Sequence, residues 1–135
     1  MSIVIDASVT LKWILDEPGT EAALALFGDE LIAPELWLAE AANALWRHVR
    51  LGEASIVEAL ARIDELANAP VASVSMGPYM RRALQMAMEM RRPVYDCLYL
   101  ALAEDRRTYV VTDDRRFFTA GSADGFADRM RMLGS

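Results

Sequence analysis

Residues 2–6 read Ser2-Ile3-Val4-Ile5-Asp6, a short apolar run that ends in an acid. A run of this length, rich in β-branched residues, is typical of a buried strand. A second such run at 109–112 is also followed by acids, and two further runs lie at 31–33 and 71–75. Helical patterns fill the intervals between the four. Strands that alternate with helices predict a three-layer α/β/α sandwich around a short, mainly parallel sheet.

The predicted helices follow from apolar spacing and from capping residues. Ser8 and Thr20 are expected to be the N-caps of the first two helices. The helices are expected at 8–15, 20–27, 34–51, 54–68, 79–91 and 94–105. The remainder from 115 to 135 is helical in pattern but interrupted at Gly121 and Gly125. At one domain per ~100–200 residues, the 135-residue chain is predicted to be a single domain spanning 1–135.

Composition excludes several classes of chemistry. One cysteine, Cys97, and one histidine, His48, rule out an intrachain disulfide and any zinc site with two or more Cys or two or more His. A nucleophilic pair of Cys97 and His48 is possible by count, but Cys97 lies in an apolar helix pattern, where a buried, inert thiol is the commoner case. Carboxylates and hydroxyls are therefore expected to carry any catalysis. No apolar run approaches the ~18 residues of a membrane span, and the first residues lack a basic, signal-like segment. A cytoplasmic protein with no membrane contact is expected.

The charge is acidic overall but unevenly placed. The net charge of −6 argues against a general nucleic-acid coating protein. Residues 1–70 hold 4 Lys+Arg and 12 Asp+Glu, whereas residues 71–135 hold 10 Arg and 8 Asp+Glu. The second half includes the pair Arg115 and Arg116, directly after the acids of the second strand. Arginine suits phosphate binding, although a solvated helix face explains such pairs equally well.

Acids occur where the predicted sheet places its carboxyl ends. Ligands bind at that edge of parallel sheets, and Asp6 and Asp114 both follow strands, although each alone also suits a helix cap. Asp96 lies in the first turn of an apolar helix, where the helix dipole is a sufficient reason for it. Glu40 lies on an otherwise apolar helix and shares one narrow polar stripe with residues at offsets of +3, +7 and +10: Asn43, Arg47 and Arg50. That stripe is either the solvent face or a surface that meets something polar.

Together these acids have a use that none has alone. Carboxylates that converge raise one another's pKa values, so such a cluster requires a cation. Oxygen ligands without His or Cys favour Mg²⁺ or Mn²⁺. Such ions lower the pKa of a bound water and neutralise charge on a phosphoryl group, which is the chemistry of phosphodiester hydrolysis. A nucleic acid is the expected substrate.

Four motifs in order resemble the PIN-domain ribonucleases, specifically VapC-type toxins of bacterial type II toxin-antitoxin pairs. The motifs are the first strand ending in Asp6-Ala7-Ser8, the helical Glu40-Ala41-Ala42-Asn43-Ala44-Leu45, the run Val94-Tyr95-Asp96-Cys97-Leu98-Tyr99-Leu100-Ala101-Leu102-Ala103, and Val111-Thr112-Asp113-Asp114-Arg115-Arg116-Phe117. The resemblance covers essentially the whole chain. Each motif is weak alone, and the four in order are a strong signal.

The resemblance implies an acidic quartet of Asp6, Glu40, Asp96 and Asp114, with Asp6 and Asp96 as direct metal ligands. Ser8 and Thr112 fall where the family has hydroxyls near the site, and Asn43 matches its polar residue one turn beyond the glutamate. Asp113 departs from the family pattern, which often has a small or amide residue before the last acid. Asp114 is favoured over it because Arg-Arg-Phe follows.

The resemblance also implies how such a protein acts. Water activated by Asp114 or Glu40 attacks an RNA phosphodiester and leaves a 5′-phosphate and a 3′-hydroxyl. Arg115 and Arg116 are the candidate phosphate contacts. The implied partners are a small cognate antitoxin that blocks the site and a second copy of the chain, giving a homodimer and toxin-antitoxin hetero-oligomers.

Two other functions compete with the nuclease. A phospho-receiver domain has similar length and a carboxylate Mg²⁺ site, but it needs a lysine late in the chain, and the only lysine is Lys12. A PIN fold kept as a binding module without turnover is the second rival, although all four acids are present. The methionines between 76 and 90, and Trp13, Trp37 and Trp46, are expected to pack in the core, although methionine-rich surfaces also adapt to partners.

Overall fold

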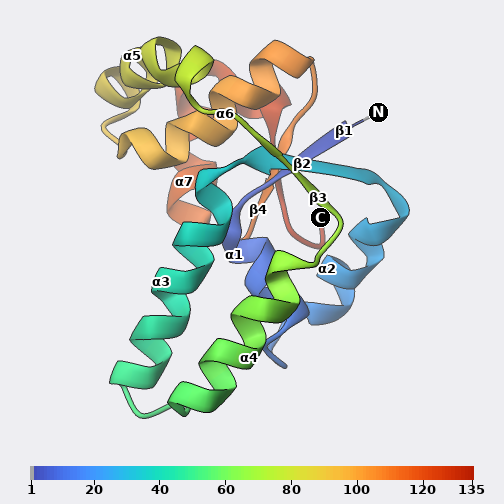
Figure 1. Cartoon of the computed structure of the whole chain (residues 1–135). Helices are drawn as coiled ribbons and strands as arrows, with labels where there is room; N and C mark the ends of the chain where they lie inside the picture. The colour runs from blue at the N-terminus through green and yellow to red at the C-terminus, as the bar shows by residue number, and fades with distance from the viewer. Residues whose placement is uncertain (1) are drawn as a thin grey trace.

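The computed structural model describes residues 2–135, and its centre is one five-stranded sheet (Figure 1). The strand order is β3-β2-β1-β4-β5, and every pairing is parallel. The strands are β1 (Ser2–Ile5), β2 (Glu30–Pro34), β3 (Val71–Val74), β4 (Val110–Thr112) and β5 (Met130–Met132). β1 lies in the middle, with Val4 opposite both Ile32 of β2 and Val110 of β4. The predicted parallel α/β sheet is confirmed.

Seven α-helices are described around this sheet. They are α1 (Ala7–Thr10), α2 (Thr20–Ala25), α3 (Leu36–Arg50), α4 (Ile56–Ala67), α5 (Met80–Met90), α6 (Val94–Arg106) and α7 (Arg115–Gly121). Short turns complete the chain: η1 (Leu11–Trp13), η2 (Leu26–Gly28), η3 (Gly77–Tyr79), η4 (Ser122–Phe126) and η5 (Ala127–Arg129). In Figure 1, α3 and α4 form a hairpin below the sheet, and α5, α6 and α7 lie above that hairpin. The molecule therefore has two lobes.

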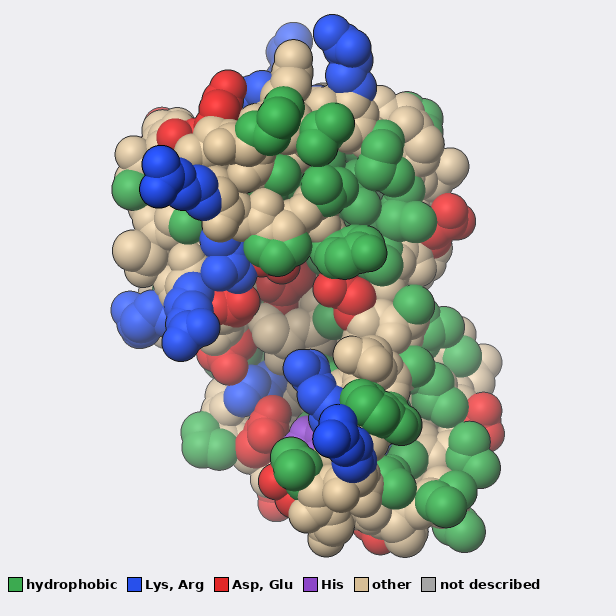
Figure 2. Space-filling model, turned by 90° about the vertical axis from the view of Figure 1, so that its left-hand side faces the viewer, with side chains coloured by type: hydrophobic (Ala, Val, Ile, Leu, Met, Phe, Trp, Pro, Cys, Tyr) green, Lys and Arg blue, Asp and Glu red, His purple; other side chains and the backbone are tan. Residues whose placement is uncertain are grey.

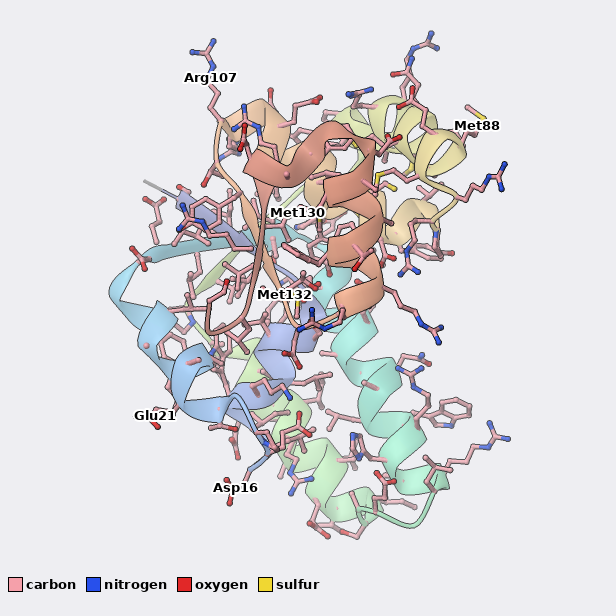
Figure 3. All side chains as sticks on the ribbon, turned by 180° about the vertical axis from the view of Figure 1, so that it is seen from behind. Asp16, Glu21, Met88, Arg107, Met130 and Met132 are labelled. Carbon is pink, nitrogen blue, oxygen red and sulfur yellow. The ribbon has the colours of Figure 1, made fainter. Side chains whose placement is uncertain are left out.

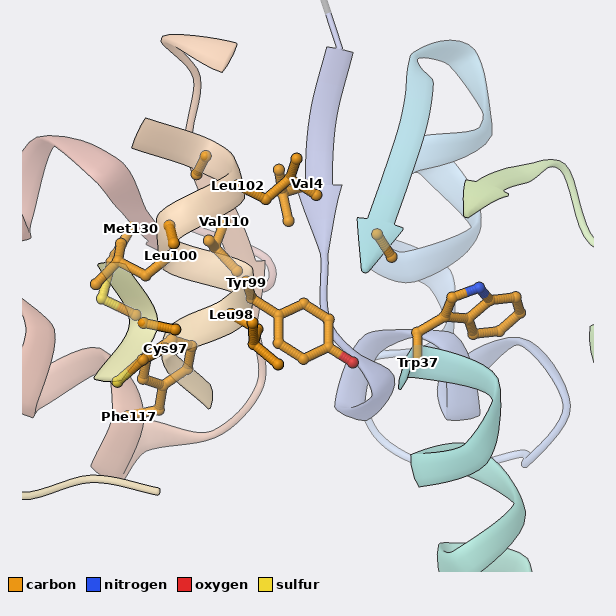
Figure 4. Close-up of a cluster of buried hydrophobic side chains, with 14 of the residues drawn as sticks. Val4, Trp37, Cys97, Leu98, Tyr99, Leu100, Leu102, Val110, Phe117 and Met130 are labelled. Atoms are coloured by element: carbon orange, nitrogen blue, oxygen red, sulfur yellow. The ribbon is translucent and has the colours of Figure 1, made fainter. Parts of the chain in front are cut away.

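Alternate side chains of the strands pack on opposite faces of the sheet. On one face, Val4 and Val110 contact α6, whose residues from Cys97 to Ala103 are all buried (Figure 4). A helix buried all round needs no amphipathic pattern, which explains its continuous apolar sequence. On the other face, residues of β1, β2 and β4 pack with α1 and α2: Ile3, Ile5, Leu31, Val111, Val9 and Ala23. These two cores make the three-layer sandwich.

The prediction of a helical C-terminus was wrong beyond Gly121. Gly125 adopts a left-handed φ of 92° that interrupts the helical path, and residues 130–132 form β5 beside β4. Met130 is buried and packs in the main core. A three-residue strand with an arginine at its centre has too little apolar alternation to be recognised in the sequence.

Several predicted helix starts were also wrong. Asp6, not Ser8, is the N-cap of α1, and Thr20 is the first residue of α2 rather than its cap. Pro34 belongs to β2, so α3 begins two residues later than predicted. α4 begins at Ile56, because Ser55 and Glu58 form a reciprocal capping box.

The expectation that the methionines and tryptophans pack in the core holds only in part. Trp37 is buried and donates from Nε1 to Ser73 Oγ at 3.0 Å, and Met86 is also buried. Trp46 is 54% exposed, and Met88 is 68% exposed at the outer edge of α5 (Figure 3). No helix within residues 2–135 is both long enough and apolar enough to span a membrane.

Candidate active site

The four predicted acids line one cleft at the carboxyl ends of β1 and β4. Asp6 follows β1 and Asp114 follows β4, while Glu40 projects from α3 and Asp96 from α6. The cleft has a volume of about 550 Å³. In Figure 2, acidic side chains lie in the hollow between the two lobes, with Lys or Arg side chains on both sides. Elements far apart in the sequence therefore bring the acids together.

Asp6 lies at the floor of the cleft and is buried. Its carboxylate accepts hydrogen bonds from the Ser8 hydroxyl and, at 3.4 Å, from the Val9 N–H. Burial raises the pKa of Asp6 from 3.8 to about 7, although the hydrogen bonds of Ser8 and Thr112 oppose the shift. Half of the Asp6 carboxyls are thus protonated near neutral pH when nothing else neutralises them.

Two hydroxyls join the strand ends around Asp6. The Ser8 hydroxyl also accepts the Asp113 N–H at 2.9 Å, so it links the end of β1 to the end of β4. Thr112 is fully buried, and its Oγ1 accepts the Asp114 N–H at 3.0 Å. Both hydroxyls therefore lie beside the acids, although only Ser8 lines the cleft.

Arg92 bridges Asp96 and Asp114 across the cleft. Its guanidinium lies 2.6 Å from Asp96 Oδ2 and 3.4 Å from Asp114 Oδ2. Burial raises the pKa of Asp96, and Arg92 partly offsets that rise. The other oxygen of Asp114, Oδ1, caps α7 by accepting the N–H groups of Arg116 and Phe117. Sequence analysis did not single out Arg92, which lies in the link between α5 and α6, four residues before Asp96.

Glu40 is held by a buried tyrosine that the sequence analysis also missed. Tyr99 donates its hydroxyl to Glu40 Oε1 at 2.6 Å. Burial raises the pKa of Glu40, the Tyr99 hydrogen bond lowers it, and the charge of Asp96 raises it. The pKa of Tyr99 is itself raised, first by burial and then by Glu40, so the phenol remains a donor. Tyr99 lies three residues after Asp96, so both project from one side of α6 into the cleft.

Besides Thr112, three predicted residues do not line the cleft. Asp113 turns away and pairs with Lys12 at 3.1 Å, and Lys12 also pairs with Glu17. Asp114, rather than Asp113, therefore faces the other acids. Arg115 and Arg116 are exposed in the first turn of α7, outside the cleft lining.

The family model of the PIN domain matches residues 3–122. The chain belongs to the PIN-domain family. Ribonuclease VapC3 of Pyrobaculum aerophilum is 31% identical to this PIN domain over 120 residues, which are 86% of this chain and 92% of the relative. This membership removes the phospho-receiver alternative.

Two solved structures share the fold of this PIN domain. PAE2754 of Pyrobaculum aerophilum superposes with a TM-score of 0.68 at 24% identity, covering 89% of this chain and 87% of that protein. VapC20 of Mycobacterium tuberculosis, described as a sarcin-ricin-loop-cleaving toxin, superposes with a TM-score of 0.66 at 16% identity, covering 92% and 95%. The β3-β2-β1-β4-β5 architecture is thus that of known PIN-domain structures.

The acids of this PIN domain suit a divalent metal in their donor chemistry. All four supply hard carboxylate oxygens, and three have pKa values raised by burial, which a bound cation would reverse. Both Arg92 hydrogen bonds to Asp96 go to Oδ2, which leaves its Oδ1 without an arginine partner. Within residues 2–135, no three His, Cys, Asp or Glu side chains are close enough to form a compact metal site. Arg92 supplies the positive charge among the acids in this arrangement.

Proposed function

We propose that this PIN domain is a metal-dependent endoribonuclease that acts as the toxin of a toxin-antitoxin pair. The observation that carries the proposal is the cleft itself, in which carboxylates from β1, α3, α6 and the end of β4 face one another. The 31% identity to a protein named as a VapC ribonuclease supports RNA as the substrate. Residues 1–135 form one domain, and a cellular RNA substrate places its action in the cytoplasm.

Asp6 and Asp96 are the residues that would hold Mg²⁺ or Mn²⁺, with Asp114 and Glu40 completing the set. When held by these residues, such a cation would lower the pKa of a water and neutralise charge on the phosphoryl group. Glu40 takes the proton of the attacking water, because it lines the cleft and, unlike Asp96 and Asp114, has no arginine against its carboxylate among the described residues. Tyr99 fixes Oε1 of Glu40, which leaves Oε2 for that proton.

The reaction is hydrolysis of the RNA backbone. The water oxygen forms a bond to phosphorus, the bond from phosphorus to the 3′-oxygen breaks, and solvent returns a proton to that oxygen. The products are a 5′-phosphate and a 3′-hydroxyl. Asp114 is the second candidate base, although Arg92 already lies against its Oδ2. Asn43 lines the cleft one turn beyond Glu40, where its amide reaches the substrate side.

The proposed partners follow from the relatives rather than from this chain. Toxins of this family act with a small antitoxin that covers the cleft and often form homodimers. The exposed apolar residues of α5 and of the α3–α4 hairpin, Leu84, Met88, Trp46 and Leu60, leave surface for both contacts.

The test is cleavage of a mixed, structured RNA pool by the purified chain in Mg²⁺, in Mn²⁺ and in chelator. Asp96→Asn is expected to lower the cleavage rate at least about 100-fold while its circular dichroism stays unchanged. Asp113→Asn is the matched control, because that acid faces Lys12 outside the cleft. Equal cleavage rates for Asp96→Asn and the parent would contradict the assignment of the acidic cleft as the active site. A parent that binds RNA but never cuts it would indicate a PIN fold used as a binding module.

A further inference from the structure

α3 continues the cleft beyond the acids with an uncompensated basic face. Glu40, Asn43 and Arg47 all line the cleft, at helix offsets of three and four residues that place them in one row. Arg50 follows three residues later. With a rise of 1.5 Å per residue, Arg47 lies about 10 Å and Arg50 about 15 Å along the helix from Glu40. The row leads from the acidic centre toward the end of the α3–α4 hairpin.

The charges of Arg47 and Arg50 are not used by the fold. Five other cations of the described chain pair with acids: Lys12, Arg62, Arg82, Arg92 and Arg106. Among residues 2–135, neither Arg47 nor Arg50 has an ion-pair partner, and both side chains are exposed. The sequence from 41 to 52 contains no acid, and Glu53 beyond it pairs with His48 at 2.7 Å. This helix face is therefore basic in a chain with a net charge of −6.

Arg50 is positioned by an aromatic neighbour. Its guanidinium lies 5.4 Å from the ring centroid of Trp46, within the range of a cation–π contact. Trp46 is 54% exposed and lies outside the core, so this contact keeps an ordered guanidinium at the surface. An ordered, unpaired arginine loses less side-chain freedom when it binds a phosphate than a mobile one does.

RNA is a polyanion, so it can enter this acidic cleft only where cations beside the acids bind its phosphates. Four carboxylates at its centre repel phosphate, so the flanking phosphates must find cations outside the acidic set. Figure 2 shows Lys or Arg side chains below the acidic hollow, on the lobe formed by α3 and α4. Cations that neutralise phosphates contribute most of the affinity of proteins for nucleic-acid strands.

We infer that the Asn43–Arg47–Arg50 face of α3 is the binding track for single-stranded RNA, with Arg47 and Arg50 contacting phosphates next to the cut bond. The inference rests on the proposed ribonuclease function and adds where the substrate strand lies. The alternative is that both arginines only stabilise the carboxyl end of α3 through the helix dipole. That alternative affects the stability of the fold and leaves RNA affinity unchanged.

The experiment measures binding of a fluorescein-labelled, single-stranded RNA of mixed sequence to the Asp96→Asn chain, which is expected to bind RNA without cutting it. Arg47→Gln and Arg50→Gln are made in that background. Each is expected to weaken the Kd about 3- to 10-fold near 0.1 M salt, and to reduce the slope of log affinity against log salt by about 0.7. Arg47→Lys keeps the charge and is expected to recover most of the affinity.

The matched control is Arg107→Gln, which removes an exposed arginine at the far end of the molecule from α3 (Figure 3). It is expected to leave both the Kd and the salt slope within error of the parent. In the cleaving chain, Arg47→Gln should raise KM and leave kcat unchanged.

The outcomes separate this inference from the proposed function. Equal Kd and salt slope for Arg47→Gln and Arg107→Gln would overturn the α3 track even if the parent cuts RNA. If Arg47→Gln and Arg50→Gln weaken RNA binding but the parent never cuts RNA, the proposed ribonuclease function is wrong and the RNA-binding role of α3 is supported.

Discussion

The buried Asp6 carboxyl predicts that the metal-free protein loses stability as the pH rises. Its pKa is about 7 in the folded chain, against an ordinary value of 3.8. The folded state therefore binds this proton more tightly than the unfolded state, so the stabilisation is complete below the ordinary value and is lost as the pH rises to about 7. Each pH unit between 3.8 and about 7 lowers the free energy of unfolding by about 1.4 kcal/mol, so the loss over the whole interval is about 4 kcal/mol. Between pH 5 and pH 8 it is about 2–3 kcal/mol.

Asp6→Asn removes this dependence, because the amide has the shape of the carboxyl and no charge. From pH 5 to pH 8, the unfolding free energy of the variant should rise by about 2–3 kcal/mol relative to that of the parent. For a chain of this length, that corresponds to roughly 7–10 °C in Tm. The assay is thermal unfolding followed by circular dichroism in chelator, at constant ionic strength. Asp113→Asn, which changes an exposed acid beside Lys12, serves as the control.

Two outcomes decide whether the reasoning holds. Tm curves for Asp6→Asn and the parent that run parallel from pH 5 to pH 8 would refute it, because the Asp6 proton would then not be linked to folding. A second arm adds Mn²⁺ at pH 8, where the parent should regain stability and the variant should not.

Three further results are expected from the same structure. Arg92→Gln removes the cation that bridges Asp96 and Asp114, so the variant should bind Mn²⁺ with a Kd several-fold lower than that of the parent in calorimetric titration. An unchanged Kd would contradict this. Tyr99→Phe removes a hydrogen bond that lowers the pKa of Glu40, so the acid limb of the pH–rate profile should move to higher pH, and an unmoved limb would argue against Glu40 as the base. Gly121→Ala places a Cβ 2.1 Å from Met130 Sδ, so unfolding in urea should show a loss of about 1–3 kcal/mol, whereas an unchanged midpoint would mean that the methionine moves aside freely.

Sequence patterns predicted the parts of this fold that follow from local periodicity. The runs at β1 and β4, and the buried α6, carry enough apolar residues to fix their type. β5 was missed because its pairing with β4 comes from tertiary contact rather than from its own three residues. Helix starts were misplaced where a strand-end acid such as Asp6 also caps the next helix.

The residues of the candidate site also divide into those that the sequence predicted and those that required the structure. The strand ends pointed to Asp6 and Asp114, and the resemblance to PIN domains added Glu40 and Asp96 as members of one quartet. The structure brings all four acids to one cleft. Arg92 and Tyr99 were missed because their roles depend on which side chains meet across elements. The separation of Asp113 from Asp114 also required the backbone path after β4, which directs one acid to Lys12 and the other to the cleft.

The order of strands has a consequence for synthesis. β1 is made long before one of its two neighbours, β4, whose Val110 pairs with Val4. A ribosome-bound fragment that stops before β4 lacks Asp114 and has no partner for one edge of β1. The acidic cleft therefore cannot assemble on a nascent chain until β4 and Asp114 have been made.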